Sequence, residues 1–448
     1  MKNLNYFERR DKIFELFGED FYERYPLSSR VLNRYIRSRI HYGDKESESI
    51  KLEYQHSKGL RGLIKSLAYY ILCLLNLSLF SFRKNTGGKI LVSYSIFLRF
   101  EILGKQLKDK YNICTALTKK NVKPIFKSKV SDIIKTDRIM YGRRLQILLP
   151  DTATFIGKFI DDEKNFDRKI LYSKLNILEN VLDREITRLG KLFINKKIKL
   201  CISAFDQNYE DTFNILACQK IGIKTKCIAH SFLAGDIESE ARTNCLPVLA
   251  NRLYIWSQED YDSLKGYEEI EKIKIGGYPK FNKEYIKRMI KEYPQKKIVT
   301  FFSGFAVDEE WMEEDLKIRR KLFNKLKEIS ENKGYEIYVR YHGEDEKDMR
   351  KGERGLLKKC HIKISRNPFI KDILQSEMSL GLHSSCLYEA KVMDRKSFLL
   401  HSKYDQKFFM KGIKFINIDD IEEKLEEKVD NKPRYDLLMN IDSIINDS

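Results

Sequence analysis

Short apolar segments alternate with longer amphipathic segments along most of this chain, beginning near residue 89. The short segments are rich in β-branched and aromatic residues, which is typical of buried strands, and the longer segments follow the helical period. Strands separated by helices predict a parallel sheet with helices on both faces. In the first half we expect strands at 89–94, 111–117, 197–204, 224–229, 252–256 and 272–275, and helices at 100–110, 168–193 and 209–221.

The alternation stops at Gly276-Gly277-Tyr278-Pro279 and at a charged connection over 280–296, and then it starts again. A second series of elements predicts a second sheet of the same type. Its strands are expected at 297–302, 335–341, 361–365, 378–382, 397–400 and 413–418, and its helices at 309–332, from Cys386 onward, at 421–429 and at 435–445. The fold class is therefore α/β, with two Rossmann-like doubly wound domains.

Apolar side chains recur near the helical spacing over 168–193, so that segment is expected to form a long amphipathic helix with one apolar face. The residues of this face are Leu171, Leu175, Ile177, Leu178, Val181, Leu182, Ile186 and Leu189. The run 138–149 is also apolar, but its type is left open.

Residues 1–86 read as a helical N-terminal extension, and 66–82 form an uncharged apolar run between basic flanks. The run is slightly short for a membrane span and contains Asn76. Basic flanks suit a helix lying in an anionic membrane surface, and the alternative is a helix buried against the protein. The expected domains are then 87–282, which would bind the acceptor, 283–430, which would bind a nucleotide donor, and a helical tail at 431–448.

The 448 residues carry a net charge of +19, which suits nucleic acid, an anionic membrane or acidic small molecules as partners. No zinc-finger spacing or RNA-binding aromatic motif is present, which disfavours nucleic acid, and no His/Cys cluster has the spacing of a metal site. The eight cysteines form no C-x-x-C pair, and Cys73, Cys201, Cys218 and Cys227 lie in apolar runs. This pattern and a polar N-terminus predict a cytoplasmic protein without a signal peptide.

Polar residues follow several expected strands directly, namely His230, Ser303-Gly304, His342 and Ser384-Ser385. In doubly wound sheets, ligands bind outside the carboxyl ends of the strands. These residues are therefore expected to line binding sites. The charge-bearing Arg340 lies two residues before His342 on the same strand, where it faces either the ligand or solvent.

The stretch 378–390 predicts a strand, a sharp turn at His383-Ser384-Ser385 and a helix from Cys386. A serine hydroxyl can cap a helix N-terminus, and the same N–H groups can bind a phosphate. Glu389 lies one turn after Ser385, where its carboxylate could accept hydrogen bonds from a ribose. The alternative is that the serines only cap the helix and that Glu389 is a solvated helix residue.

Four segments together resemble motifs of bacterial transferases with the glycosyltransferase B-type (GT-B) fold. Residues 213–235 (FNILACQKIGIKTKCIAHSFLAG) are similar to the helix, turn and strand that lead to a His-Gly loop, and 275–281 (IGGYPKF) to a Gly-x-Pro segment. Residues 339–343 (VRYHG) take the place of a His-Pro motif, and His383-Ser384-Ser385 with Glu389 looks like a Ser-Ser motif.

The families that carry these motifs build capsules, teichoic acids and lipooligosaccharides. They include CDP-glycerol glycerophosphotransferases, polysialyltransferases and capsule Kdo transferases, and the resemblance covers about residues 87–430. The sequence departs from their patterns at Ser231, at Gly343 and at Thr212, which follows the acidic pair Glu210-Asp211 where a glycine is usual.

The resemblance implies glycosyl transfer without a metal or another cofactor. A base must deprotonate the acceptor hydroxyl, and histidine titrates near neutrality, so we assign this role to His230, with Asp206 and Asp211 as rivals. His342, aided by Arg340, would donate to the leaving phosphate, and Glu389 would bind the ribose. The complete set of expected donor-binding residues is Ser303, Gly304, Arg340, His342, His383, Ser384, Ser385 and Glu389.

The expected function is the transfer of a sugar from a nucleotide-sugar donor, such as a CMP sugar, to a bacterial surface polysaccharide or a lipid-linked glycan. Such an enzyme would work at the inner face of the plasma membrane. Two alternatives stay open: a CDP-polyol phosphotransferase of the teichoic-acid type, and a non-catalytic GT-B scaffold subunit.

Overall fold

The computed structural model describes thirteen stretches of the chain, namely 23–32, 88–117, 132–140, 143–161, 167–204, 209–229, 248–267, 269–304, 309–341, 346–382, 384–403, 412–427 and 433–447. The chain divides into two compact units. The amino-terminal unit comprises residues 1–230 and 245–254, and the carboxyl-terminal unit comprises residues 231–244 and 255–448. The apolar run 66–82 lies outside the described residues. Among those described, no helix is both long enough and apolar enough to cross a bilayer.

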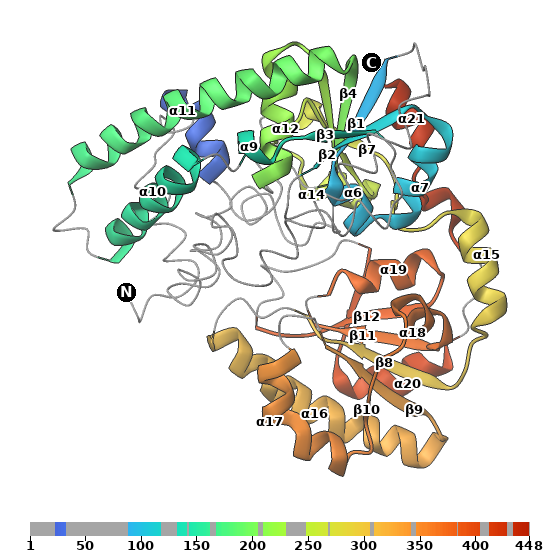
Figure 1. The fold of residues 1–448 in the computed structure, drawn as a ribbon. Coiled ribbons are helices and arrows are strands. Elements are labelled where there is room, and N and C mark those ends of the chain that lie inside the picture. The colour runs from blue at the N-terminus through green and yellow to red at the C-terminus, as the bar shows by residue number, and fades with distance from the viewer. Residues whose placement is uncertain are drawn as a thin grey trace, which may run out of the picture. The chain divides into compact units, whose positions relative to one another are not determined.

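The first sheet has seven strands in the order β3-β2-β1-β4-β5-β6-β7, and the ladders that join β3 through β6 are parallel (Figure 1). Its first six positions follow the Rossmann order, in which the chain direction across the sheet reverses beside the first strand. The strands are β1 (Lys89–Val92), β2 (Ile113–Leu117), β3 (Ile133–Lys135), β4 (Ile198–Ser203), β5 (Lys224–Ile228), β6 (Arg252–Ile255) and β7 (Ile273–Ile275). The expected strands of the first half are confirmed, and β3 is an addition that the sequence pattern did not predict.

Helices of the first half are α6 (Tyr94–Arg99), α7 (Glu101–Lys110), α9 (Asp137–Met140), α10 (Arg143–Asp161), α11 (Arg168–Asn195), α12 (Tyr209–Lys220) and α14 (Gln258–Ser263). The apolar run 138–149 therefore belongs to α9 and α10, and α10 continues beyond Pro150. The predicted inner face of α11 is correct except at Ile177, which is half exposed. A position can match the helical period and still lie at the edge of the buried face.

The second sheet has six strands, all parallel, in the order β10-β9-β8-β11-β12-β13. Counted from β8 as its first strand, this is again the Rossmann order. The strands are β8 (Ile298–Phe302), β9 (Glu336–Arg340), β10 (Lys363–Ile364), β11 (Met378–Gly381), β12 (Lys396–Leu400) and β13 (Lys414–Ile416). The prediction of an α/β fold with two Rossmann-like sheets is confirmed.

Helices α16 (Glu309–Lys333), α17 (Glu346–Lys359), α18 (Phe369–Gln375), α19 (Cys386–Val392) and α20 (Ile421–Glu426) accompany the second sheet (Figure 1). Strand residues such as Val299, Phe301 and Leu380 are buried and share one core with α16 residues such as Leu322 and Leu326. Helix α15 (Lys283–Glu292) precedes this sheet, and α21 (Ile441–Asn446) ends the chain. The expected domain boundary between residues 282 and 283 stays a prediction. So does the assignment of acceptor binding to the domain before it and of donor binding to the domain after it.

The turn that separates the two series of elements is held by a backbone pairing. The N–H of Tyr278 donates to the carbonyl of Leu437 over 2.7 Å, and the N–H of Met439 donates to the carbonyl of Tyr278 over 3.0 Å. Gly277 has a φ of +90°, and a Cβ added there would lie 2.8 Å from the carbonyl carbon of Leu438. Glycine is therefore required at this position both by its backbone angle and by space.

Replacement of Gly277 by alanine is expected to lower the free energy of unfolding by about 1–3 kcal/mol, because the substitution strains the backbone and pushes it away from Leu438. Gly355→Ala on α17 is the matched control. A Cβ at Gly355 meets nothing within 4 Å, so the helix should gain up to about 1 kcal/mol. Urea denaturation measures both variants, and equal stabilities for them would contradict the strain at Gly277.

Candidate functional site

The second sheet brings the predicted serine motifs to one edge. Strands β8 and β11 are neighbours, with Phe302 opposite Gly381, and the direction of the chain across the sheet reverses between them. The residues that directly follow these two strands, Ser303-Gly304 and Leu382, therefore leave the sheet side by side. This is the position where doubly wound sheets bind ligands.

Ser303 is buried, and its contacts within the protein are extensive. Its N–H donates to the carbonyl of Arg340, and its hydroxyl accepts a 2.7 Å hydrogen bond from Arg319 Nη2. The same hydroxyl lies 3.1 Å from the carbonyl of Gly304, to which it can donate. Arg319 on α16 therefore holds Ser303, the first residue after β8, and the donor-binding role expected for Ser303 and Gly304 stays a prediction.

The helix that follows Ser384-Ser385 differs from the sequence-based expectation. Helix α19 has only seven residues, and Ser385, its N-cap residue, makes no side-chain cap hydrogen bond. Ser384 accepts a long 3.4 Å hydrogen bond from the N–H of Cys386. Of the two serines that could cap the helix, Ser384 therefore contacts its first residue, whereas the side chain of the partly exposed Ser385 does not cap it.

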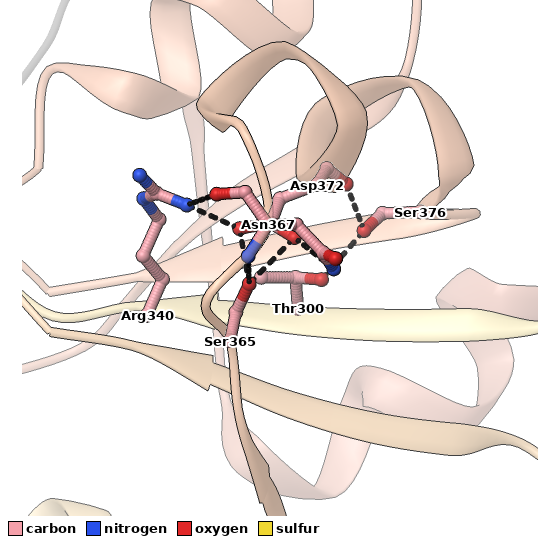
Figure 2. A network of polar contacts seen from close by, with 6 residues as sticks. All are labelled: Thr300, Arg340, Ser365, Asn367, Asp372 and Ser376. Carbon is pink, nitrogen blue, oxygen red and sulfur yellow. Dashed lines mark hydrogen bonds and ion pairs between the residues drawn. The ribbon is translucent and has the colours of Figure 1, made fainter. Parts of the chain in front are cut away.

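Arg340 belongs to a polar network centred on Asp372 of α18 (Figure 2). Its Nη1 donates to Asp372 Oδ2 over 2.6 Å and to the carbonyl of Asn367 over 2.9 Å. Asp372 also accepts from the hydroxyl of Ser365 and, over 3.0 Å, from Asn367 Nδ2. In Figure 2 the other guanidinium nitrogens of Arg340 point away from this network. Arg340 was expected to face either the ligand or solvent. One of its nitrogens instead contacts Asp372 inside the protein, while the side chain as a whole stays 28% exposed.

Glu389 lies on α19 and is fully buried, so the alternative of a solvated helix residue is wrong. Its Oε1 forms an ion pair with Lys280 Nζ, and the Lys280 side chain is 29% exposed. Burial raises the pKa of the Glu389 carboxyl, while the charges of Lys280 and Arg340 and the hydroxyl of Tyr278 oppose this shift. The ribose-binding role of Glu389 stays a prediction.

Two cations lie beside one aromatic ring at this edge. Lys280 Nζ is 5.8 Å from the ring centroid of Phe369, and Arg340 Cζ is 5.4 Å from the same centroid. Lys280 also lies 5.4 Å from the ring centroid of Trp256, in the range of cation–π attraction. Burial raises the pKa of the nearby Cys386 thiol to about 11, with a further rise from the charge of Glu389, so this thiol stays protonated.

Three residues at this edge had no role predicted from the sequence, namely Lys280, Phe369 and Asp372. Lys280 directly follows the Gly276-Pro279 turn, so its place in a recognised motif was the available signal. Asp372 follows the Asn367-Pro368 turn by one helical turn. Neither signal reveals its partner, because Lys280 and Glu389 are 109 positions apart along the chain.

In the amino-terminal unit, Asp211 lies at the start of α12 and is fully buried. The hydroxyl of Ser93, which follows β1, donates a hydrogen bond to its carboxylate. Nearby, the hydroxyl of Ser95 accepts a 3.0 Å hydrogen bond from the N–H of Ala204, which follows β4. A catalytic base must lie within reach of the proton that it removes from the substrate. Burial and the contact with Ser93 favour an anchoring role for Asp211 over the role of base.

Four of the predicted residues, His230, Asp206, His342 and His383, lie outside the described residues. Within the described stretches, no three His, Cys, Asp or Glu side chains come together to hold a metal ion. Cys201, Cys218 and Cys227 are buried free thiols, as expected, whereas Cys73 is outside the described stretches.

No protein-family model matches this chain, and no curated protein matches it. Solved structures of similar fold include the UDP-GlcNAc 2-epimerase of Methanocaldococcus jannaschii, with a TM-score of 0.46, 12% identity and coverage of 78% of this chain and 96% of that chain. The UDP-N-acetylglucosamine 2-epimerase of Rickettsia bellii has a TM-score of 0.45 and 10% identity, with coverage of 78% and 92%. The wall teichoic acid polymerase TagF has a TM-score of 0.38 and 11% identity, with coverage of 83% and 89%.

Proposed function

We propose that this protein is a glycosyltransferase that binds a nucleotide-activated sugar on its carboxyl-terminal unit. One observation supports this most: the two loops beside the reversal point of the second sheet carry Ser303, Gly304, Ser384 and Ser385, with Arg340 and Lys280 at the same edge. Doubly wound sheets bind nucleotides at such points, and phosphate requires cations and hydroxyl or N–H donors.

In this proposal, His230 is the base that takes the proton of the acceptor hydroxyl. His342 and Arg340 stabilise the negative charge that develops on the leaving phosphate. The acceptor is a growing surface polysaccharide or a lipid-linked glycan, which the basic protein meets at the inner face of an anionic membrane.

Nucleotide binding is tested by the melting temperature of the purified full chain in millimolar CMP, CDP, UDP or GDP. A nucleotide that binds only the folded state stabilises it by about 2.7 kcal/mol at a hundredfold excess over Kd. We expect one nucleotide base to be selected, and Ser385→Ala to remove most of the shift. Because the Ser385 side chain makes no cap hydrogen bond, this substitution should leave the melting temperature of the free protein unchanged.

Ser443→Ala is the matched control, since Ser443 is an exposed serine of the same unit on α21. It should keep the full shift. Absence of a shift with all four nucleotides would contradict the transferase proposal. An equal shift in the Ser385→Ala variant would remove Ser385 from the binding site.

A further inference from the structure

The two cations at the edge of the second sheet are each held by a buried carboxylate. Arg340 contacts Asp372, and Lys280 contacts Glu389, while the two cationic side chains remain partly exposed. Both cations lie within 6 Å of the ring centroid of Phe369. This arrangement fixes two positive charges beside one ring and leaves both within reach of a ligand.

The two carboxylates differ in the number of hydrogen bonds that they accept. Asp372 accepts hydrogen bonds from Arg340, Ser365 and Asn367, so both of its carboxylate oxygens have donors (Figure 2). Glu389 has an ion pair at Oε1, but its Oε2 has no hydrogen bond of standard geometry among the described residues. Charge on Glu389 therefore depends mainly on Lys280.

The charges of these four residues indicate how a bound anion would affect Glu389. Lys280 and Arg340 balance Glu389 and Asp372, so the group of four is neutral as a whole. A phosphate group beside Lys280 weakens the ion pair of Glu389 and adds a negative charge close to it. Like charges in a buried site favour protonation of the less stabilised carboxylate. A proton on Glu389 leaves the site with a net positive charge that suits the ligand.

We propose that Lys280 and Arg340 together bind the diphosphate group of a nucleoside diphosphate donor, and that Glu389 takes up a proton as this ligand binds. This proposal rests on the proposed function and names the donor class within it. Two separate cations match two phosphate charges, whereas the single phosphate diester of a CMP sugar needs only one. Groups that face Glu389 are Lys280 and Tyr278 before α15, Arg340 on β9 and Cys386 on its own helix.

Titration calorimetry of the full chain at pH 8 tests the binding residues, with CDP, UDP, CMP and inorganic pyrophosphate as probes. We expect at least one nucleoside diphosphate to bind more tightly than CMP. Lys280→Gln should weaken its binding by about tenfold or more, because a charged hydrogen-bond donor to the phosphate is lost. Lys280→Arg, which keeps the charge, should retain most of the affinity. Lys287→Gln removes an exposed lysine of α15 and should change nothing.

Repeating the titrations in two buffers of different ionisation enthalpy counts the protons that are taken up. The wild-type protein should take up more protons than Glu389→Gln, and this difference cancels the contribution of the nucleotide's own phosphate. Glu389→Gln should bind the diphosphate at least as tightly as the wild type, since a buried negative charge is gone. If Glu389 instead binds a ribose, Glu389→Gln should bind the nucleotide more weakly than the wild type, and both proteins should take up the same number of protons.

The outcomes separate the two proposals. If no nucleotide and no pyrophosphate binds the wild type, the proposed function itself fails. Wild-type binding of CDP or UDP that is unchanged in Lys280→Gln, with both proteins folded by their melting curves, overturns only the role of Lys280. Equal affinity for CMP and the diphosphates overturns the donor class. Weaker binding by Glu389→Gln overturns the protonation step.

Discussion

Replacement of Asp372 by alanine is expected to lower the free energy of unfolding of the carboxyl-terminal unit by about 3–5 kcal/mol. The buried carboxylate accepts hydrogen bonds from Arg340, Ser365 and Asn367, and its loss leaves these donors without their shared acceptor. The network also continues through the backbone of Asp372, whose carbonyl accepts from Ser376, and Ser376 contacts Thr300 over 2.6 Å (Figure 2). The substitution thus loosens α18 from β9 and from the loop after β10, whereas the link to β8 through the backbone carbonyl of Asp372 remains.

Urea denaturation followed by tryptophan fluorescence suits this test, because both tryptophans of the chain, Trp256 and Trp311, belong to the carboxyl-terminal unit. Asp372→Asn keeps the size and part of the hydrogen bonding, so it should cost less than the alanine variant. Asp419→Ala, at an exposed acidic position of the same unit, should change the free energy by less than about 0.5 kcal/mol. A cost for Asp372→Ala that is as small as this control would show that the network contributes little.

Arg319→Met is expected to have an effect of similar size, about 3–5 kcal/mol, on the same unit. Arg319 is completely buried and pairs with the buried Glu353 at 3.4 Å, while Glu353 also accepts a 2.6 Å hydrogen bond from Tyr341. The methionine keeps the aliphatic packing but leaves Glu353 as a buried charge without its cation. It also removes the donor that holds the hydroxyl of Ser303.

A second variant distinguishes the uncompensated charge from lost packing. Arg319→Met combined with Glu353→Gln removes both charges and should recover a large part of the lost stability, because a buried ion pair is often replaceable by neutral groups. The same fluorescence-monitored urea curves measure both proteins. If the double variant is less stable than the single one by the full cost of Glu353→Gln alone, the two residues do not interact energetically.

Much of the fold followed from the sequence because parallel strands are buried on both faces. Such strands must be short apolar runs, and the helices between them must be apolar on one side, so both patterns are visible in the residues themselves. Four elements were not predicted from the sequence, namely β3, α6, α15 and α18. Strand β3 (Ile133–Lys135) has three residues and α6 (Tyr94–Arg99) has six, so neither is long enough to show a clear period.

The candidate site was predictable only at the level of position along the chain. Ser303 and Ser384 follow strands, and the alternation of elements was sufficient to bring both to one edge of the second sheet. The partners of their neighbours were not predictable, because ion pairs such as Lys280 with Glu389 join residues that are far apart in sequence. The sequence-based role of Glu389 treated it as accessible, but only packing determines that α19 turns this residue inward.

By itself, the sequence determined the fold class, the order of most strands and helices, and the sheet edge that carries the polar loops, because these depend on local periodicity and chain connectivity. Only the tertiary structure decided which charges are buried and which cation each carboxylate holds. Burial changes the energy of a charge far more than that of an apolar group, and it depends on neighbours from the whole chain. For this reason Glu389, Lys280 and Asp372 acquired their roles only in the folded protein.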